Sequence, residues 1–588
     1  MDARRSSHVR ALERLSPELA WSCVLSDYIV RHAGRLRLDV LEGCDISAPL
    51  FFLQLRKIAD PKCFPAPIVI RLHSLAQKFS GWGPGEPYAR GFYALDHAEN
   101  FSIGAAQGLL ATTKFTRDII CRKTGIAKAE LPVIALPLAA GDAKLFQAQA
   151  KRDPWRGIFA GRLEPRKGPD LLIHAALPWL RRHPRLEIHL LGFDTLTHRK
   201  SSMLAHLRRL VPLAYRRRFR FTGPLTLREL KDELGSCGFF ALTSRFDNSP
   251  YVALEAAAAG CPIIATRTSG LSELFQDGHS ALFCSARVAP LSKTIGRLLA
   301  MSDAERAKMA EAAQERAAKL CDPRVIAEQQ AVLYRNVIRR PRRPRRPRLP
   351  PNFPFRDLHA GTRRPRPMVE TRARMDNKPS IVSIVRVERL KTAAAKNAAA
   401  RATKSDYLIF LDAGQSVSGE YLRRAAKALD LNPELGFAWP WPASSQVKND
   451  IRPPWVFEFP LALTESLAPS YSVVRRRAFE NAGGLAPASN AARQFDNLWI
   501  SIGEKGWGGL PLIGAFNRGI RGADCSLEPD SKRSLAGHAA LRRRFELQLS
   551  RMQAARRRER RNASVDWDKA CSALALWKSA LHRNYDRR

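Results

Sequence analysis

Short apolar runs that alternate with helical stretches limit the fold of this chain more than any other feature. The runs are each short enough for one buried strand, and the stretches between them are long enough for a covering helix. This alternation is typical of βα units that build parallel sheets. An interruption near residues 138–142 separates two such series, so the sequence predicts two doubly wound α/β domains that face each other. The runs lie at residues 36–41, 67–72, 108–112, 157–161, 186–192, 239–243 and 262–266.

A run of arginines and prolines divides the chain. It starts with RRPRRPRRPRLPP at residue 339, and up to residue 378 it holds thirteen Arg and one Lys against three acidic residues. Repeated proline blocks helices and sheet ladders, so we interpret the run as a linker; a membrane tether and a nucleic-acid contact are the alternatives. The predicted parts are a shortened N-terminal domain (1–145), a second domain (146–338), the linker (339–378), a partial α/β segment (379–530) and a basic helical tail (531–588).

Composition limits the class of protein and its compartment. Hydrophobic residues make up 45% and charged residues 26% of the chain, as in ordinary globular proteins, which argues against disorder over most of its length. The net charge of +42 attracts nucleic acid, anionic lipid or phosphorylated substrates without naming one. Ten cysteines without a CxxC pair suit reduced thiols. With no signal-like N-terminus and no apolar run long enough for a bilayer, we expect a cytoplasmic protein with at most peripheral membrane contact.

Two cations and two carboxylates mark the strongest candidate site. Arg162 and Lys167 follow the strand-like residues 158–160, where the carboxyl edge of a parallel sheet binds ligands, and two fixed cations can neutralise a diphosphate without a metal. Asp247 and Glu255 lie eight residues apart around the next turn, placed to meet the hydroxyls of a sugar and a ribose. Between them a helix begins, and its N-terminal backbone can face phosphate. This N-terminal stretch consists of Ser249, Pro250, Tyr251 and Val252. The order of these parts fits a nucleotide-sugar.

The same stretch resembles the retaining GT-B glycosyltransferases of family four. The motifs that carry the resemblance are GRLEPRKGPDLLI, FTGPLTLRELKDELGSCGFFALTSRFD, SPYVALEAAAAGCPIIAT and SGLSEL, in the family's order. It covers about residues 30–340 and is densest over 157–285. It implies that Arg162 and Lys167 hold the donor diphosphate, that the backbone at 249–252 meets phosphate and that Glu255 binds the ribose. Asp247 stands where the family usually has Glu, and would contact the transferred sugar.

The upstream half resembles the acceptor side of these enzymes less completely. His73, after the run VIRL, matches a histidine that faces the reaction site in that family; a polar cap at the end of a strand is the alternative. The family's first strand and glycine-rich loop have no counterpart, and residues 1–30 are Arg-rich and helix-like. We therefore expect a shortened acceptor-side domain, and the predicted catalytic residues are His73 in this domain and Asp247 in the second domain.

The region after the linker resembles part of a family-two, GT-A-type glycosyltransferase. The matching segments are KNAAARAT, YLIFLDAG, RRRAFENAGGL and FDNLW. That family holds a divalent ion on Asp-x-Asp, but here Asp412 is followed by Ala413 and Gly414. Asp496 stands where the family has its catalytic base. The resemblance implies a vestigial second site at Asp412 and Asp496, without a metal.

These observations predict a bacterial glycosyltransferase without a metal or other cofactor. It would transfer a sugar, with retention, from a nucleoside-diphosphate-sugar to a glycan or lipid-linked saccharide in cell-surface polysaccharide or lipopolysaccharide synthesis. Its predicted partners are that donor, that acceptor and an anionic membrane surface at the inner face, but no specific nucleic acid. A non-catalytic nucleotide-sugar-binding scaffold and a polyanion-binding protein are the alternatives.

Overall fold

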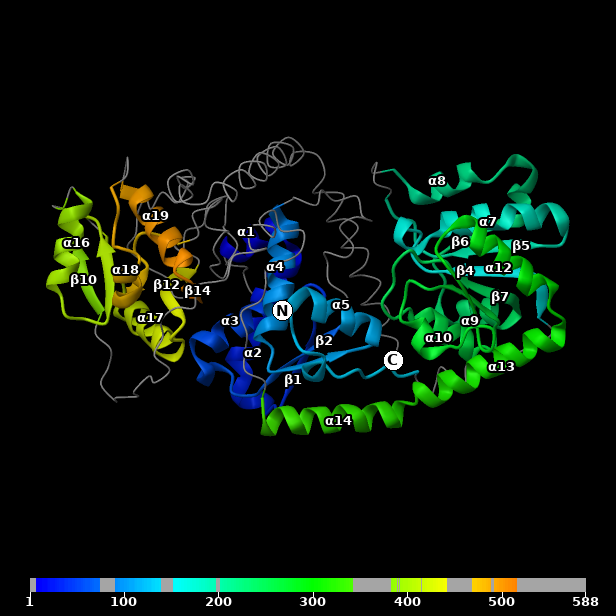
Figure 1. Ribbon diagram of the computed structural model, residues 1–588, viewed down its shortest axis with the longest axis horizontal. Coiled ribbons are helices and arrows are strands. Elements are labelled where there is room, and N and C mark those ends of the chain that lie inside the picture. Colours follow the sequence, from blue (N-terminus) through cyan, green and yellow to red (C-terminus); the bar gives the residue numbers. More distant parts are fainter. Residues whose placement is uncertain are drawn as a thin grey trace.

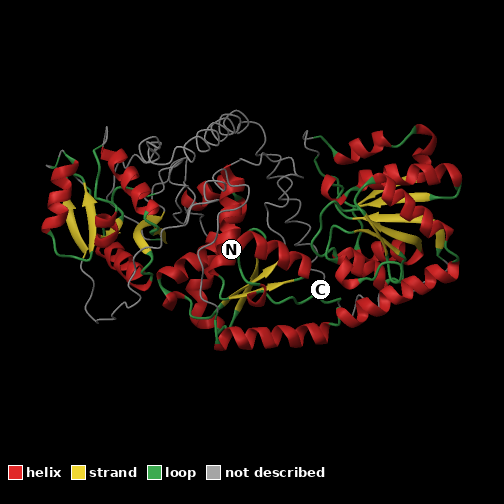
Figure 2. Cartoon of the chain, viewed as in Figure 1, coloured by secondary structure: helices red, strands yellow, loops and turns green. Residues whose placement is uncertain are grey.

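In the computed structural model the chain forms three α/β parts, each built on one sheet (Figures 1 and 2). The structure describes residues 7–73, 90–138, 152–196, 201–341, 382–388, 390, 392–413, 415–441, 468–487 and 491–514. The predicted linker lies outside the described residues from residue 342 onward, and the predicted basic tail of 531–588 lies wholly outside them.

The first part is built on three parallel strands in the order β1-β2-β3. The strand predicted at residues 36–41 begins at Leu41 instead, because helix α2 continues to Leu36 and Arg37, at φ 44°, ends it in the left-handed conformation. The central strand is completely buried. The elements are α1 (Ser7–Leu15), α2 (Pro17–Leu36), β1 (Leu41–Cys44), α3 (Phe51–Ala59), β2 (Ile68–Leu72), α4 (Arg90–Ala105), β3 (Gly108–Ala111) and α5 (Lys114–Thr124).

The second part carries a six-stranded parallel sheet in the order β6-β5-β4-β7-β8-β9. Helices cover both faces, because alternate residues of the central strands point to opposite sides: Phe240 belongs to one apolar cluster and Phe239 to the other. Gly157 makes room for the Phe239 ring, which a Cβ there would approach to 2.3 Å. The strands are β4 (Asp153–Ala160), β5 (Glu187–Leu191), β6 (Phe219–Gly223), β7 (Cys237–Leu242), β8 (Ile263–Thr266) and β9 (Leu282–Cys284). The helices are α7 (Pro169–Arg182), α8 (Met203–Leu210), α9 (Leu227–Ser236), α10 (Tyr251–Ala258), α11 (Leu271–Leu274), α12 (Val288–Ala300) and α13 (Asp303–Leu320).

The last helix of this series returns to the first sheet. Helix α14 (Pro323–Arg339) follows α13 and runs beneath the first part (Figure 1). Its Val337 belongs to one cluster with Val69 of β2, and the Tyr334 hydroxyl donates to Glu42 of β1 at 2.6 Å. Gly108 of β3 leaves space for Val337, whose Cγ2 a Cβ would meet at 2.6 Å. The predicted domain of residues 146–338 therefore shares its last helix with the first sheet.

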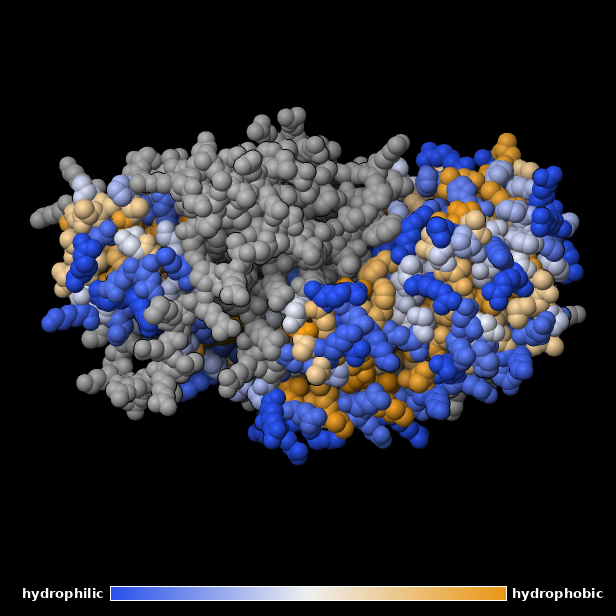
Figure 3. All heavy atoms as spheres, in the orientation of Figure 1, coloured by the Kyte–Doolittle hydropathy of each residue, from blue (hydrophilic) through white to orange (hydrophobic). Residues whose placement is uncertain are grey.

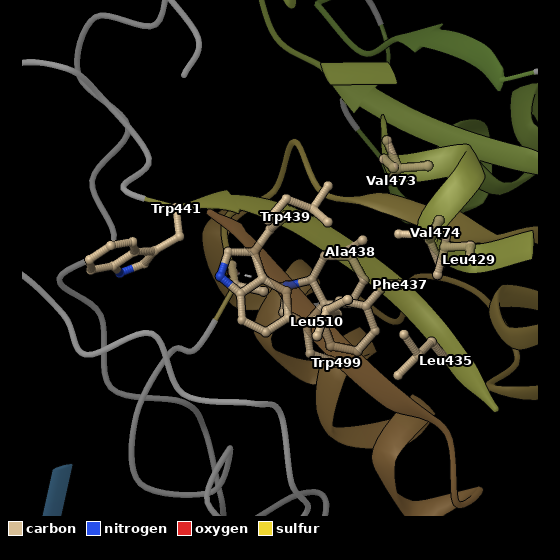
Figure 4. Packing of buried hydrophobic residues seen from close by; sticks show 14 of the residues in the cluster. Leu429, Leu435, Phe437, Ala438, Trp439, Trp441, Val473, Val474, Trp499 and Leu510 are labelled. Carbon is tan, nitrogen blue, oxygen red and sulfur yellow. Dashed lines mark hydrogen bonds between the residues drawn. The ribbon is translucent and has the colours of Figure 1, made fainter. Parts of the chain in front are cut away.

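The third part is a mixed five-stranded sheet in the order β10-β11-β13-β12-β14. The apolar segment YLIFL of the family-two resemblance forms the fully buried strand β11, and helix α17 follows it. The Phe437 ring stacks on two tryptophans, with its centroid 4.5 Å from that of Trp499 and 5.5 Å from that of Trp439 (Figure 4). The elements are β10 (Val382–Arg386), α16 (Ala393–Ala402), β11 (Tyr407–Leu411), α17 (Gly419–Leu431), β12 (Leu435–Trp441), β13 (Val473–Arg475), α18 (Arg476–Asn481), α19 (Ala491–Glu504) and β14 (Gly508–Ile513).

Helix α3 joins the first part to the third. Phe52 on α3 is fully buried, and its ring lies 5.2 Å from that of Trp441, at the end of β12. At the rim of this contact Lys427 pairs with Asp60 at 2.7 Å, and Asn432 donates to the carbonyl of residue 58. Residues of α1 to α4 and of the third sheet form one continuous apolar cluster. The predicted parts 1–145 and 379–530 are thus packed together although the Arg/Pro run separates them in sequence.

Stability should fall in mild acid because of one buried histidine. Burial lowers the pKa of His97 on α4 to about 3, below the ordinary 6.5, so the folded protein keeps this ring neutral. Below pH 6.5 the unfolded chain takes up a proton that the folded chain refuses, and the free energy of unfolding drops by up to about 1.4 kcal/mol per pH unit down to about pH 3. In urea unfolding between pH 7.5 and 5, the free energy of unfolding should depend less on pH in His97→Gln than in the wild type. The control His279→Gln, at an exposed position, should show the pH dependence of the wild type.

Candidate active site

Two of the four residues of the predicted constellation, Lys167 and Asp247, meet after the carboxyl ends of β4 and β7. The Lys167 ammonium lies 2.5 Å from Oδ2 of Asp247, and both side chains are largely buried. Lys167 ends the short 3-10 helix Pro165–Lys167, and Gly168 then turns the chain into α7 at φ 69°. A Cβ on Gly168 would stand 2.2 Å from the carbonyl oxygen of Thr243. Only glycine allows this close approach of the two loops, which is what brings the cation to the carboxylate.

Arg166 is a member of the site that sequence reasoning missed. Its side chain is 5% exposed, donates to the carbonyl of Phe246 at 3.0 Å and comes within 3.6 Å of Asp247. It also pairs with Glu164. Asp247 therefore lies between two cations, and Arg166 fixes the loop that carries it. The motif GRLEPRKG showed three basic residues, but nothing in their spacing told which of them turns inward.

The remaining predicted donor-binding residues lie on the loop after β4 and around the start of α10. The Arg162 side chain is 59% exposed, and its guanidinium lies 3.4 Å from the Glu164 carboxylate. Helix α10 begins at Tyr251, and the side chain of Pro250 at its N-cap forms no capping hydrogen bond. The Tyr251 hydroxyl donates to the carbonyl of Pro137. Ser249 and Glu255 are partly buried, and Val252 packs against the apolar cluster beneath.

His73 approaches the same loop from the first part. Its backbone N–H donates to Oδ1 of the fully buried Asp45 at 2.8 Å, and its carbonyl accepts a hydrogen bond from the Asn248 side chain, one residue beyond Asp247. Burial, aided by the nearby Arg71, lowers the pKa of His73, so the ring is neutral at physiological pH. Asp45 was not predicted; an acid directly after a strand was the available signal.

The two residues of the vestigial second site lie in the third part. Asp412 follows β11 and Asp496 is buried on α19. Buried Lys396 donates to Gln494 at 3.0 Å; burial lowers the pKa of Lys396 and the charge of Asp412 opposes that shift. Within the described ranges no three His, Cys, Asp or Glu side chains gather as a metal site would require. The Lys396 ammonium lies near Asp412, the one carboxylate left of the Asp-x-Asp motif, and a cation there does not fit a divalent ion. We therefore assign no reaction step to this site.

Comparisons with known proteins agree with this division. Residues 156–301 match the family "Glycosyl transferases group 1", and residues 360–496 match "Glycosyl transferase family 2". The first stretch contains Arg162, Lys167 and Asp247, and the second contains Asp412 and Asp496. Residues 156–301 belong to the group 1 glycosyltransferases. The predicted GT-B fold, followed by a partial GT-A-like segment, is confirmed, and the chain is a glycosyltransferase of the GT-B type.

Individual relatives are distant. Glycogen synthase of Mycobacterium tuberculosis is 28% identical over 328 residues, which cover 54% of this chain and 75% of the relative. A D-inositol 3-phosphate glycosyltransferase of Streptomyces bingchenggensis is 32% identical over 236 residues, 37% of this chain and 50% of the relative. Among solved structures, sucrose-phosphate synthase from Thermosynechococcus elongatus aligns over 55% of this chain and 79% of its own, at 21% identity and a TM-score of 0.44. The chain thus spans three quarters of the first relative and half of the second.

The described helices also bear on membrane contact. None of them is both long enough and apolar enough to cross a bilayer.

Proposed function

We propose that this protein transfers a hexosyl group from a nucleoside-diphosphate-sugar to a hydroxyl of a glycan or lipid-linked saccharide, with retention at the anomeric carbon. The observation that carries the proposal is the meeting of Lys167, Arg166 and Asp247 at the mouth of a parallel sheet, beside an uncapped helix N-terminus. A cation pair next to the N-terminus of a helix suits a diphosphate, and the adjacent carboxylate suits sugar hydroxyls. Cell-surface polysaccharide or lipopolysaccharide synthesis is the setting that we propose.

The catalytic contribution of these residues is electrostatic. As the bond to the sugar breaks, negative charge grows on the departing diphosphate, and Arg162, Lys167 and the α10 N-terminus stabilise it without having to reorganise. We propose that this arrangement does the work for which other transferases use a metal ion. Asp247 would hold the transferred sugar, Glu255 the ribose, and the neutral His73 would face the reacting centre from the other part.

A panel of ligands tests the donor assignment. Thermal unfolding of the intact protein with nucleoside diphosphates and their sugars should show at least one ligand that raises Tm, because a ligand that binds only the folded state stabilises it. The shift should vanish in the Arg162→Ala/Lys167→Ala variant. If no nucleotide raises Tm while nucleic acid binds with a steep salt dependence that this variant retains, the polyanion-binding alternative replaces the proposal. If a donor binds but no acceptor extract supports turnover, the scaffold alternative holds.

Peripheral contact with an anionic membrane is the remaining part of the proposal. Helix α14 carries apolar side chains at its surface: Val325 is 43%, Val332 49% and Ile338 45% exposed. Exposed arginines, among them Arg335 and Arg339, alternate with them, and Figure 3 shows hydrophobic atoms between hydrophilic ones over this helix. Such a face suits a layer of anionic head groups. Binding to anionic vesicles without binding to neutral ones is the measurement that decides it.

A further inference from the structure

The Glu273 side chain of the second part caps the N-terminus of a helix of the first part. Glu273 lies on α11 and contacts the N-terminus of α5, which is far away in the sequence. Its Oε2 accepts the backbone N–H of Lys114 and its Oε1 that of Phe115, both at 2.6 Å. Both oxygens are used, one for each of the first two residues of the helix. The pair of bonds therefore spans the boundary between the two α/β parts.

The start of α5 shows why this contact matters. A helix leaves its first N–H groups without intrahelical partners, and the N-cap side chain usually satisfies only one of them. Here Thr113 is the N-cap and accepts the N–H of Thr116 at 3.0 Å. The N–H groups of Lys114 and Phe115 take their partner from Glu273 instead. A negative carboxylate at the positive end of the helix adds a favourable charge–dipole interaction.

Glu273 is also tied to the loop that carries Asp247. It follows the turn 268–270, in which the carbonyl of Thr268 accepts the N–H of Asp247 at 3.1 Å, and the N–H of Gly270 donates to the carbonyl of Asn248 at 3.0 Å. The backbone of this turn runs so close to the first part that a Cβ on Gly270 would stand 2.5 Å from Cγ2 of Thr113. The turn 268–270 thus contacts both the Asp247 loop and the N-terminus of α5.

The far side of this contact reaches His73. The Asn248 side chain donates to the carbonyl of His73, and the Phe246 ring lies 5.8 Å from that of Phe115. Phe246, Asn248 and Glu273 therefore contact the first part at two separate points, His73 and the N-terminus of α5. A shift of either part relative to the other changes the separation of His73 and Asp247.

We propose that Glu273 is a positioning residue that latches the two α/β parts together and so sets Asp247 opposite His73. The latch itself rests only on the contacts above, whereas its effect on transfer rests on the proposed function. Glu273 touches neither Lys167 nor Arg162 in any described contact, so it acts through the placement of the loop and not through the diphosphate.

Hydrogen exchange of the full-length chain tests the latch. In Glu273→Gln the side chain keeps its size but loses its charge and one of its two acceptors, so exchange of the Lys114 and Phe115 amides should accelerate at least about fivefold. Glu305→Gln is the matched control: Glu305 also accepts a backbone N–H in a helix N-terminal cap, but that of Ser302 within its own capping box. The control should leave the Lys114 and Phe115 amides unchanged. Equal exchange at these amides in wild type and Glu273→Gln overturns the latch.

Diphosphate binding and donor turnover distinguish a positioning role of Glu273 from a purely structural one. Glu273→Gln should bind nucleoside diphosphate within about twofold of wild type, because the cations are untouched, while donor turnover falls about tenfold through misplacement of the reacting groups. Faster exchange with unchanged turnover overturns the positioning role. If the wild-type protein binds no nucleotide, the proposed function fails by itself, and the exchange comparison still decides whether Glu273 joins the two parts.

Discussion

Asp247→Asn is expected to tighten binding of a nucleoside diphosphate by about tenfold, or ~1.4 kcal/mol, while it lowers sugar transfer at least about 100-fold. The opposite signs follow from the ion pair: Lys167 is bound to the Asp247 carboxylate at 2.5 Å, with Arg166 at 3.6 Å, so a diphosphate competes with that carboxylate for the cations. The amide of Asn releases the cations to the phosphates. It also removes the negative charge and replaces one of the two acceptor oxygens that we propose for the transferred sugar by a donor. Calorimetric titration with the diphosphate and a donor-turnover assay measure the two effects.

Lys167→Met is the matched control for this prediction. It removes the cation and leaves Asp247 in place, so both diphosphate affinity and turnover should fall. The pair Asp247→Asn and Lys167→Met then differ in the sign of the binding change and agree in the loss of transfer. Weaker diphosphate binding in Asp247→Asn would mean that the carboxylate supports the phosphate site and does not compete for it.

Phe52→Ala should destabilise the first and third parts together. The ring is fully buried between α3 and Trp441, and removal of a buried phenylalanine lowers the free energy of unfolding by about 3–5 kcal/mol. Because α1 to α4 and the third sheet share one apolar cluster, the loss should appear on both sides of the contact. Hydrogen exchange of the full chain should show reduced protection in β11, β12 and β14 as well as in α3.

Phe159→Ala provides the comparison within the second part. Phe159 is equally buried, but in a cluster confined to the six-stranded sheet and its helices. Its replacement should cost a similar free energy without lowering protection in β11, β12 or β14. If Phe52→Ala also spares those strands, the third part does not depend on α3 for its stability.

Much of this architecture was readable from local pattern. Apolar runs at residues 67–72, 108–112, 186–192 and 262–266 coincide with strands, and the SDAE sequence at residue 302, typical of a capping box, forms that box at the start of α13. Such features depend on neighbours a few residues apart, so the sequence carries them directly. Strands β6 and β9 were not predicted: β9 is only three residues long, and two of the five residues of β6 are glycine and arginine.

The candidate site was readable only in part. Lys167 and Asp247 were predicted to converge, and they do so at 2.5 Å. Their roles stay predictions. The inward turn of Arg166, the contact of Asp45 with His73 and the Glu273 cap were not predictable, because each joins residues whose distance in space depends on how two loops or two parts meet.

By itself, the amino-acid order determined the alternation of strands and helices, the βα class of the first two parts and the residue types available for a diphosphate-sugar, since these follow from spacing and from side-chain chemistry. Tertiary structure alone decided which cation faces the acid, that α14 returns to the first sheet, and that α3 shares its core with a segment more than 300 residues away. Burial and long-range contact depend on closing large loops, and no local spacing encodes which surfaces those loops bring together.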